Sequence, residues 1–162
     1  RGGSMKVRTD FVTNSSSSSF IIVFKSVADR EKQFNILRER YPIFAQTIIS
    51  DIENNKITKE EALKKIKEDL ESEAMWKYYW NNSIYWGRYS KFKDVDPYTD
   101  PTIQKAVKEY VEIGLEKVLK ELPKRGYYAI VEYGDDDGAW YGELEHEIMP
   151  YQDFVVRRIS HH

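Results

Sequence analysis

The sequence contains no cysteine among its 162 residues. Disulfide scaffolds, thiolate zinc sites and cysteine nucleophiles are therefore excluded, and the fold must be stabilised by packing alone. Long apolar runs are also missing, because the longest, Phe20 to Phe24, is far too short to span a bilayer. Since no charged segment followed by an apolar one precedes this run, we predict a cytoplasmic protein without a membrane partner.

Neither sign of charge dominates the sequence. The 25 basic and 27 acidic residues give a formal net charge of -2 and are spread along the chain. No strong field is expected from this distribution, so nucleic acid is not an expected partner. Aromatic residues are abundant at 14%, which indicates recognition surface as well as core. The partner is expected to be a small molecule or a protein.

The length of the chain is that of one domain with one core. Arg1 to Ser4, ahead of Met5, are interpreted as residues left over from expression. Residues 5–162 are then predicted to form a single domain.

The N-terminal half predicts strands followed by helices. A short strand is predicted over Met5–Val12, and the apolar run Phe20–Phe24 predicts a strand that is buried on both faces. Ser26 with Asp29 resembles a capping box at the start of a helix. Pro42 ends this helix and can begin a second one that extends to about Glu53.

A third helix is predicted to begin at the capping box formed by Thr58 and Glu61 and to reach about Tyr79. Residues 81–99 lose all periodicity and predict a long ordered loop. Asp100 followed by Pro101 starts the clearest helix, which ends at Pro123.

The C-terminal part predicts two more strands, over Tyr127–Tyr133 and Phe154–Ile159. Between them, the spacing of Trp140, Leu144 and Ile148 favours a helix with Asp137 as its cap, although a strand over 141–148 is an alternative. Together these elements predict the α/β class, with a small mixed sheet of three to four strands covered by about five helices.

The last two strands are joined by about twenty residues that include a helix, so they are predicted to run parallel with their carboxyl ends at one edge of the sheet. Ligands usually bind at this edge in α/β proteins, and clustered carboxylates and imidazoles suit Mg²⁺, Mn²⁺ or Zn²⁺. The alternative is a solvated acidic turn beside a terminus that is frayed or carries the remainder of an affinity tag. The predicted metal ligands are Asp135, Asp137, His161 and His162.

A run of hydroxyl side chains stands directly before the first buried strand. Hydroxyls and backbone amides at such a place can surround an anion or a phosphate, although the run contains no Gly-Lys pair and no histidine partner by spacing. A polar structural loop is the alternative. If the first strand lies antiparallel to the last two, this run joins their carboxyl edge. The predicted ligand-binding residues are Thr13, Asn14, Ser15, Ser16, Ser17, Ser18 and Ser19.

The segment Glu143–Glu147 gathers three acids around His146. An exposed helix face accounts for this composition. Alternatively, His146 completes the metal site or acts as a general base.

An aromatic block with interleaved basic residues runs over 76–89. Such a block can stack on bases or sugars or bind a protein, whereas packing of the rings within the chain is the alternative.

The segment from Arg8 to Phe20 contains Thr-Asn and five serines. Together with Leu144-Glu145-His146 and the ending Arg158-Ile159-Ser160-His161-His162, it resembles a group of uncharacterised bacterial proteins that share a Thr-Asn-Ser-rich amino end and an Ile-Ser-His-His carboxyl end. The resemblance covers about a quarter of the chain. It implies that the terminal histidines are native, and it implies no activity.

Taken together, the sequence predicts a ligand- or partner-binding α/β domain with a polar Ser/Asp/His site. One alternative is a metal-dependent hydrolase acting on phosphoesters or nucleotides, with His146 as base. The other is a protein interaction module that uses the aromatic block.

Overall fold

The computed structural model describes residues 17–78, 96 and 98–161. They belong to two compact units, one made of residues up to 62 together with those from 123 onward, and one made of residues 63–122. The predicted strand over 5–12 and most of the predicted loop over 81–99 lie outside the described residues.

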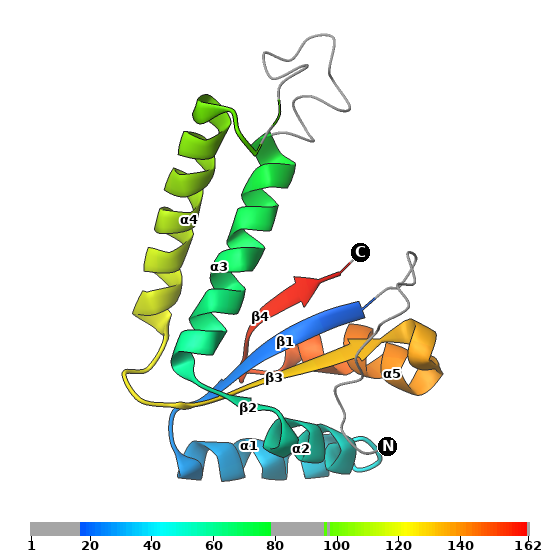
Figure 1. Ribbon diagram of the computed structural model, residues 1–162. Coiled ribbons are helices and arrows are strands. Elements are labelled where there is room, and N and C mark those ends of the chain that lie inside the picture. The colour runs from blue at the N-terminus through cyan, green and yellow to red at the C-terminus, as the bar shows by residue number, and fades with distance from the viewer. Residues whose placement is uncertain (1–16, 79–95, 97, 162) are drawn as a thin grey trace. The chain divides into compact units, whose positions relative to one another are not determined.

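The first unit contains a four-stranded sheet in the order β2-β3-β1-β4 (Figure 1). Its strands are β1 (Ser17–Phe24), β2 (Lys56–Ile57), β3 (Tyr127–Gly134) and β4 (Val155–Ser160). This arrangement confirms the predicted α/β class and strand number.

Every neighbouring pair in this sheet is antiparallel. The strands β3 and β4 nevertheless share one direction, as predicted, because β1 lies between them and is antiparallel to both. The carboxyl ends of β3 and β4 therefore lie at the same end of the sheet as the amino end of β1. The short strand β2, which extends the sheet at one edge, was not expected from the sequence.

The central position of β1 explains why its apolar run is continuous. Phe20, Ile22 and Phe24 face the main core, and Ile21 on the opposite face is equally buried. The helices α1 (Val27–Arg40) and α2 (Ala45–Asn54) cover the core face (Figure 1). The main core contains Phe20, Ile22, Phe24, Phe34, Leu37, Ala45, Ile48, Ile49, Ile52, Ala129, Val131, Tyr133, Leu144, Ile148, Met149 and Phe154.

Local signals set the bounds of α1 and α2. Ser26 Oγ accepts a hydrogen bond from the Asp29 amide at 3.0 Å, and the Lys25 amide donates to Asp29 Oδ2 at 2.9 Å, which confirms the expected cap. The helix α2 begins at Ala45 rather than at Pro42, because a turn over residues 42–44 precedes it.

Between β3 and β4 the chain is helical, as favoured by the sequence. It forms a 3-10 turn η3 (Asp135–Asp137), the short helix α5 (Ala139–Glu143), a π-helical turn η4 (Leu144–Ile148) and a 3-10 turn η5 (Met149–Tyr151). The expected cap by Asp137 is not formed, because Gly138 precedes α5 with a φ of 122° and no side chain caps the helix.

Two further helices are α3 (Lys59–Met75) and α4 (Pro101–Glu121). The Thr58–Glu61 capping box is confirmed, since the amide of each residue donates to the side chain of the other at 3.0 Å. Asp100 caps α4 by accepting from the Ile103 amide. Within residues 63–122, a Cβ on Gly114 would lie 2.7 Å from Leu70 Cδ2, so this glycine permits close packing.

Across the part of the chain that the structure describes, no helix combines the length and the apolarity needed to cross a membrane.

Candidate functional site

The serine run and the C-terminal motif are neighbours in the sheet. Ser18 pairs with Ser160, and the His161 amide donates to the Ser17 carbonyl at 2.9 Å. The two ends of the described chain thus form one structural element, at the end of the sheet where β3 also terminates. Because side chains alternate along a strand, Ser18 points to one face of the sheet and Ser17 and Ser19 to the other.

Ser18 connects two charged groups on the core face. Its side chain is fully buried, and its hydroxyl donates to Glu145 Oε2 at 2.9 Å. Ser18 Oγ in turn accepts a hydrogen bond from Arg158 Nε at 3.0 Å. Ser18 is therefore fixed between an acid on η4 and a base on β4.

Glu145 is fully buried, and charged groups surround it. Its Oε1 lies 3.1 Å from His146 Nε2, and its Oε2 lies 3.8 Å from Arg158 Nη2. The other neighbours of the imidazole are Asp135 Oδ2, 3.5 Å from Nε2, and Arg158 Nη2, 3.4 Å from Nδ1. A buried carboxylate is tolerated only with such charged or hydrogen-bonding partners.

The prediction of an exposed helix face over Glu143–Glu147 is wrong for Glu145, which is buried. The chain forms a π-helical turn over Leu144–Ile148, and this turn directs both Leu144 and Glu145 into the interior. His146 and Asp135 remain 40% and 45% exposed, so the cluster is open to solvent on one side. A π-helical turn is rare and frequently found at functional sites.

Asp135, Glu145 and His146 each present one ligand atom, and these three atoms lie within 4.8 Å of one another. Two carboxylate oxygens and one imidazole nitrogen form a donor set that suits a divalent transition metal. We call these three residues the acid–histidine cluster. The residues present fit a metal ion, and three protein ligands leave further coordination positions for water or substrate.

The predicted metal ligands are only partly brought together. Asp135 belongs to the acid–histidine cluster, whereas Asp137 lies in the same 3-10 turn but outside that group. His161 lies at the same end of the sheet with its ring on Ser19, and His162 is outside the described residues. Glu145 was missed as a ligand, since nothing in its sequence context marks it as buried.

The opposite face of β1 carries a second polar group. Ser19 Oγ and His161 Nε2 are 2.8 Å apart, and Ser17 Oγ donates to Glu132 Oε2 at 3.2 Å. The sequence spacing indicated no histidine partner for the serine run, and the structure supplies one through the pairing of β1 with β4. Thr13, Asn14, Ser15 and Ser16 lie outside the described residues.

Most of the aromatic block also lies outside the described residues. Within its described part, the side chain of Trp76 is 48% exposed, and the ring of Tyr78 makes an edge contact with Tyr110 at 6.4 Å. One ring is thus packed within the chain and another is open to solvent.

No protein-family model, curated protein or solved structure matches the chain.

Proposed function

We propose that this chain is a ligand-binding α/β domain that holds a divalent metal ion at Asp135, Glu145 and His146. The observation that carries the proposal is the fully buried carboxylate of Glu145, with an aspartate and a histidine beside it and ligand atoms within 4.8 Å of one another. In this proposal Glu145 and His146 are the metal ligands beside Asp135, in place of Asp137, His161 and His162, which were predicted from the sequence.

The surroundings of Glu145 support a preorganised ligand. Ser18 donates to Oε2 and Arg158 lies on the same side, so the carboxylate is held in one orientation with Oε1 toward His146. Outer contacts of this kind orient metal ligands and strengthen binding. Because one ligand is an imidazole, Zn²⁺ and Mn²⁺ fit the cluster better than Mg²⁺, which prefers oxygen ligands and water.

Isothermal titration calorimetry with Zn²⁺ and with Mn²⁺ tests this proposal on the full chain. We expect a single site, and the variant Glu145→Gln should bind at least about tenfold more weakly because one charged ligand is lost. Asp136→Asn is the matched control, since it removes a neighbouring carboxylate outside the cluster and should change affinity little. Affinity should also fall as the pH is lowered, because protons compete for imidazole and carboxylate ligands.

Two results would contradict metal binding at this cluster. One is the absence of any saturable heat with either ion at millimolar concentration. The other is equal affinity of the wild type and Glu145→Gln, which would place the ion elsewhere. The variant His161→Gln tests whether the C-terminal histidine is also a ligand, because its affinity for the ion should fall only in that case.

A second candidate function is a metal-dependent hydrolase acting on phosphoesters or nucleotides, and the position of Arg158 favours it. Its guanidinium lies 3.4 Å from the His146 ring and is 33% exposed. Guanidinium groups bind phosphate oxygens well, and a metal ion when bound supplies an activated water. In this arrangement His146 would be a ligand rather than the general base.

The charges of the cluster add to this argument. Two carboxylates against one guanidinium leave one excess negative charge, and a divalent ion would convert this to one excess positive charge. The loaded site would then attract an anion.

Hydrolysis of p-nitrophenyl phosphate with and without Mn²⁺ tests the hydrolase, and Arg158→Gln should slow any turnover. Metal binding without metal-dependent turnover would remove the hydrolase and keep the binding domain.

A further inference from the structure

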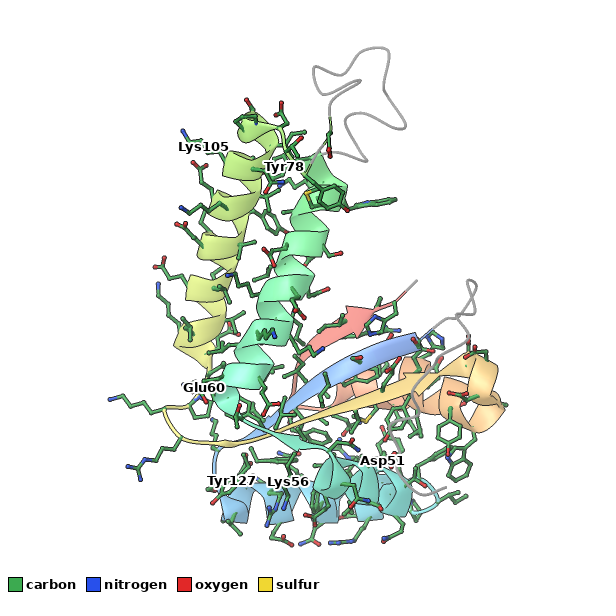
Figure 2. All side chains as sticks on the ribbon, in the orientation of Figure 1. Asp51, Lys56, Glu60, Tyr78, Lys105 and Tyr127 are labelled. Carbon is green, nitrogen blue, oxygen red and sulfur yellow. The ribbon has the colours of Figure 1, made fainter. Side chains whose placement is uncertain are left out.

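A pocket opens at the end of the sheet opposite to the acid–histidine cluster, where β1 ends and β3 begins. It encloses about 490 Å³ of space free of atoms, its open mouth included. Figure 2 shows Lys56 and Tyr127, two of its lining residues, near this end of the sheet. The pocket lies entirely among residues of the first unit.

Most of the pocket wall is apolar. Phe24, Ile52 and Ala129 belong to the main core and also line the pocket, and Ile57 and the ring of Tyr127 complete the apolar part. Their side chains come from both sheet and helix, so the wall is built on rigid elements. A wall of this kind binds the apolar body of a small molecule.

Arg30, on α1, is a more buried positive charge at this wall than Lys56, with 19% of its side chain exposed against 62%. Its Nε is buried and makes no hydrogen bond within the described part of the chain. The nearest acid, Glu31, lies 3.7 Å from this Nε, which is too long for a hydrogen bond. The guanidinium carbon lies 5.6 Å from the centre of the Tyr127 ring, which holds the group beside the pocket.

A buried donor without an acceptor is costly, because it has lost its water without gaining a partner. An acceptor in the pocket would remove this cost. The other charges at the pocket, Lys56 and Glu53, lie 3.7 Å apart and neutralise each other at the exposed rim. Arg30 has Glu31 at the same distance, but its buried Nε has no hydrogen-bond acceptor within the described residues, so Arg30 is the charged donor that a ligand can satisfy.

We propose that this pocket binds a small carboxylic acid with an apolar body, its carboxylate on Arg30 and its body against Phe24, Ile52 and Ala129. A carboxylate matches the planar guanidinium and can accept from Nε together with a terminal nitrogen. A single negative charge fits one guanidinium, whereas a phosphate dianion would lose more hydration than one guanidinium returns. This site is separate from the proposed metal site and does not depend on it.

Phenylacetate is a suitable probe, with phenylacetamide as its uncharged counterpart. The signal of the Arg30 Nε–H group in a ¹H–¹⁵N correlation spectrum reports directly on the expected contact. We expect saturable shifts with a dissociation constant of about 1 mM, typical of a fragment of this size. The amide should bind at least about tenfold more weakly, since it lacks the charge-assisted hydrogen bonds.

Two substitutions on neighbouring positions of α1 make a matched pair. Arg30→Gln should weaken phenylacetate binding at least about tenfold, because the charged donor is lost. Glu31→Gln should bind as tightly as the wild type or more tightly, because it removes the only carboxylate that competes for Arg30 in the described part of the chain. Circular dichroism and urea unfolding of both variants verify that they remain folded.

The proposal is overturned if phenylacetate produces no saturable shift up to about 20 mM, well above the expected dissociation constant. It is equally overturned if the amide binds as well as the acid, or if Arg30→Gln and Glu31→Gln have the same effect. Loss of metal binding at the acid–histidine cluster has no bearing on any of these results.

Discussion

Arg158 and Glu145 form the partly buried ion pair on which the acid–histidine cluster is built, and their coupling can be measured. The guanidinium Nη2 and the carboxylate Oε2 are 3.8 Å apart, with the acid fully buried and the base 33% exposed. Coulomb's law gives about 4 kcal/mol for such a pair at an effective dielectric constant of about 20. Exposure of Arg158 to solvent reduces this value, so we expect a coupling energy of about 2 kcal/mol.

A double-mutant cycle with Arg158→Met and Glu145→Gln isolates this term. Methionine keeps the apolar stem over the Phe20 ring, which the guanidinium carbon approaches to 5.9 Å, and glutamine keeps an acceptor for the Ser18 hydroxyl. Arg158→Met alone should cost about 3 kcal/mol, because the buried carboxylate loses its counter-charge. In the Glu145→Gln background the same substitution should cost only about 1 kcal/mol.

Urea unfolding followed by circular dichroism provides the four free energies of the cycle. The exposed pair Lys56–Glu53, at 3.7 Å, is the matched control, and its cycle should give a coupling of less than about 0.5 kcal/mol. A coupling between Arg158 and Glu145 as small as that of the control would show that burial of Glu145 does not depend on the guanidinium, and the electrostatic account of the cluster would be refuted.

Three further predictions concern the stability of the fold. Tyr133→Phe should lower the free energy of unfolding in urea by about 2 kcal/mol, because the Tyr133 hydroxyl donates to the buried Asp51 at 2.7 Å. Tyr128→Phe should leave it unchanged, since the buried Tyr128 hydroxyl, whose pKa burial raises, has no hydrogen bond among the described residues. Gly138→Ala should cost about 1 to 3 kcal/mol, because its φ of 122° strains any side-chain-bearing residue although no atom lies within 4 Å of the added carbon; an unchanged melting temperature would contradict this. Thr58→Ala should cost about 1 kcal/mol through loss of the helix cap. Hydrogen bonds from the backbone and side chain of Thr58 lower the pKa of Glu61. The stability that ionised Glu61 contributes is therefore present above the usual glutamate pKa and is lost as the pH falls through the lower folded value. In Glu61→Gln that part of the acid dependence should disappear.

The sequence predicted the elements whose signals are local. The serine and aspartate caps at Ser26 and Asp100 and the Thr58 capping box start helices where they were expected. The apolar run of β1 also identified the strand at the centre of the sheet. In these cases adjacent residues alone satisfy the backbone or bury the apolar face.

The prediction failed where structure depends on a change of helical period. With 3.6 residues per turn, Glu145 lies about 100° around the helix from Leu144, at the margin of the apolar face. The π-helical turn has a longer period, so it moves Glu145 inward while Leu144 and Ile148 stay buried. No residue in this segment signals that change in advance. The sequence therefore predicted an exposed Glu145, whereas this side chain is fully buried. The antiparallel arrangement of β1 brings the serine run to the edge of His161, as the sequence predicted for that case. The particular pair Ser19–His161 was not predicted, because it joins residues 142 positions apart.

The pairing of β1 with β4 has a consequence for synthesis on the ribosome. The serines of β1 are synthesised well before their partners Arg158 and His161, which lie 140 and 142 positions later along the chain. A nascent chain therefore lacks the β4 partner of the apolar run Phe20–Phe24 until residues 155–160 have been synthesised, and closure of so long a loop is a slow step. Ribosome-bound intermediates that lack β4 should accordingly need chaperone protection.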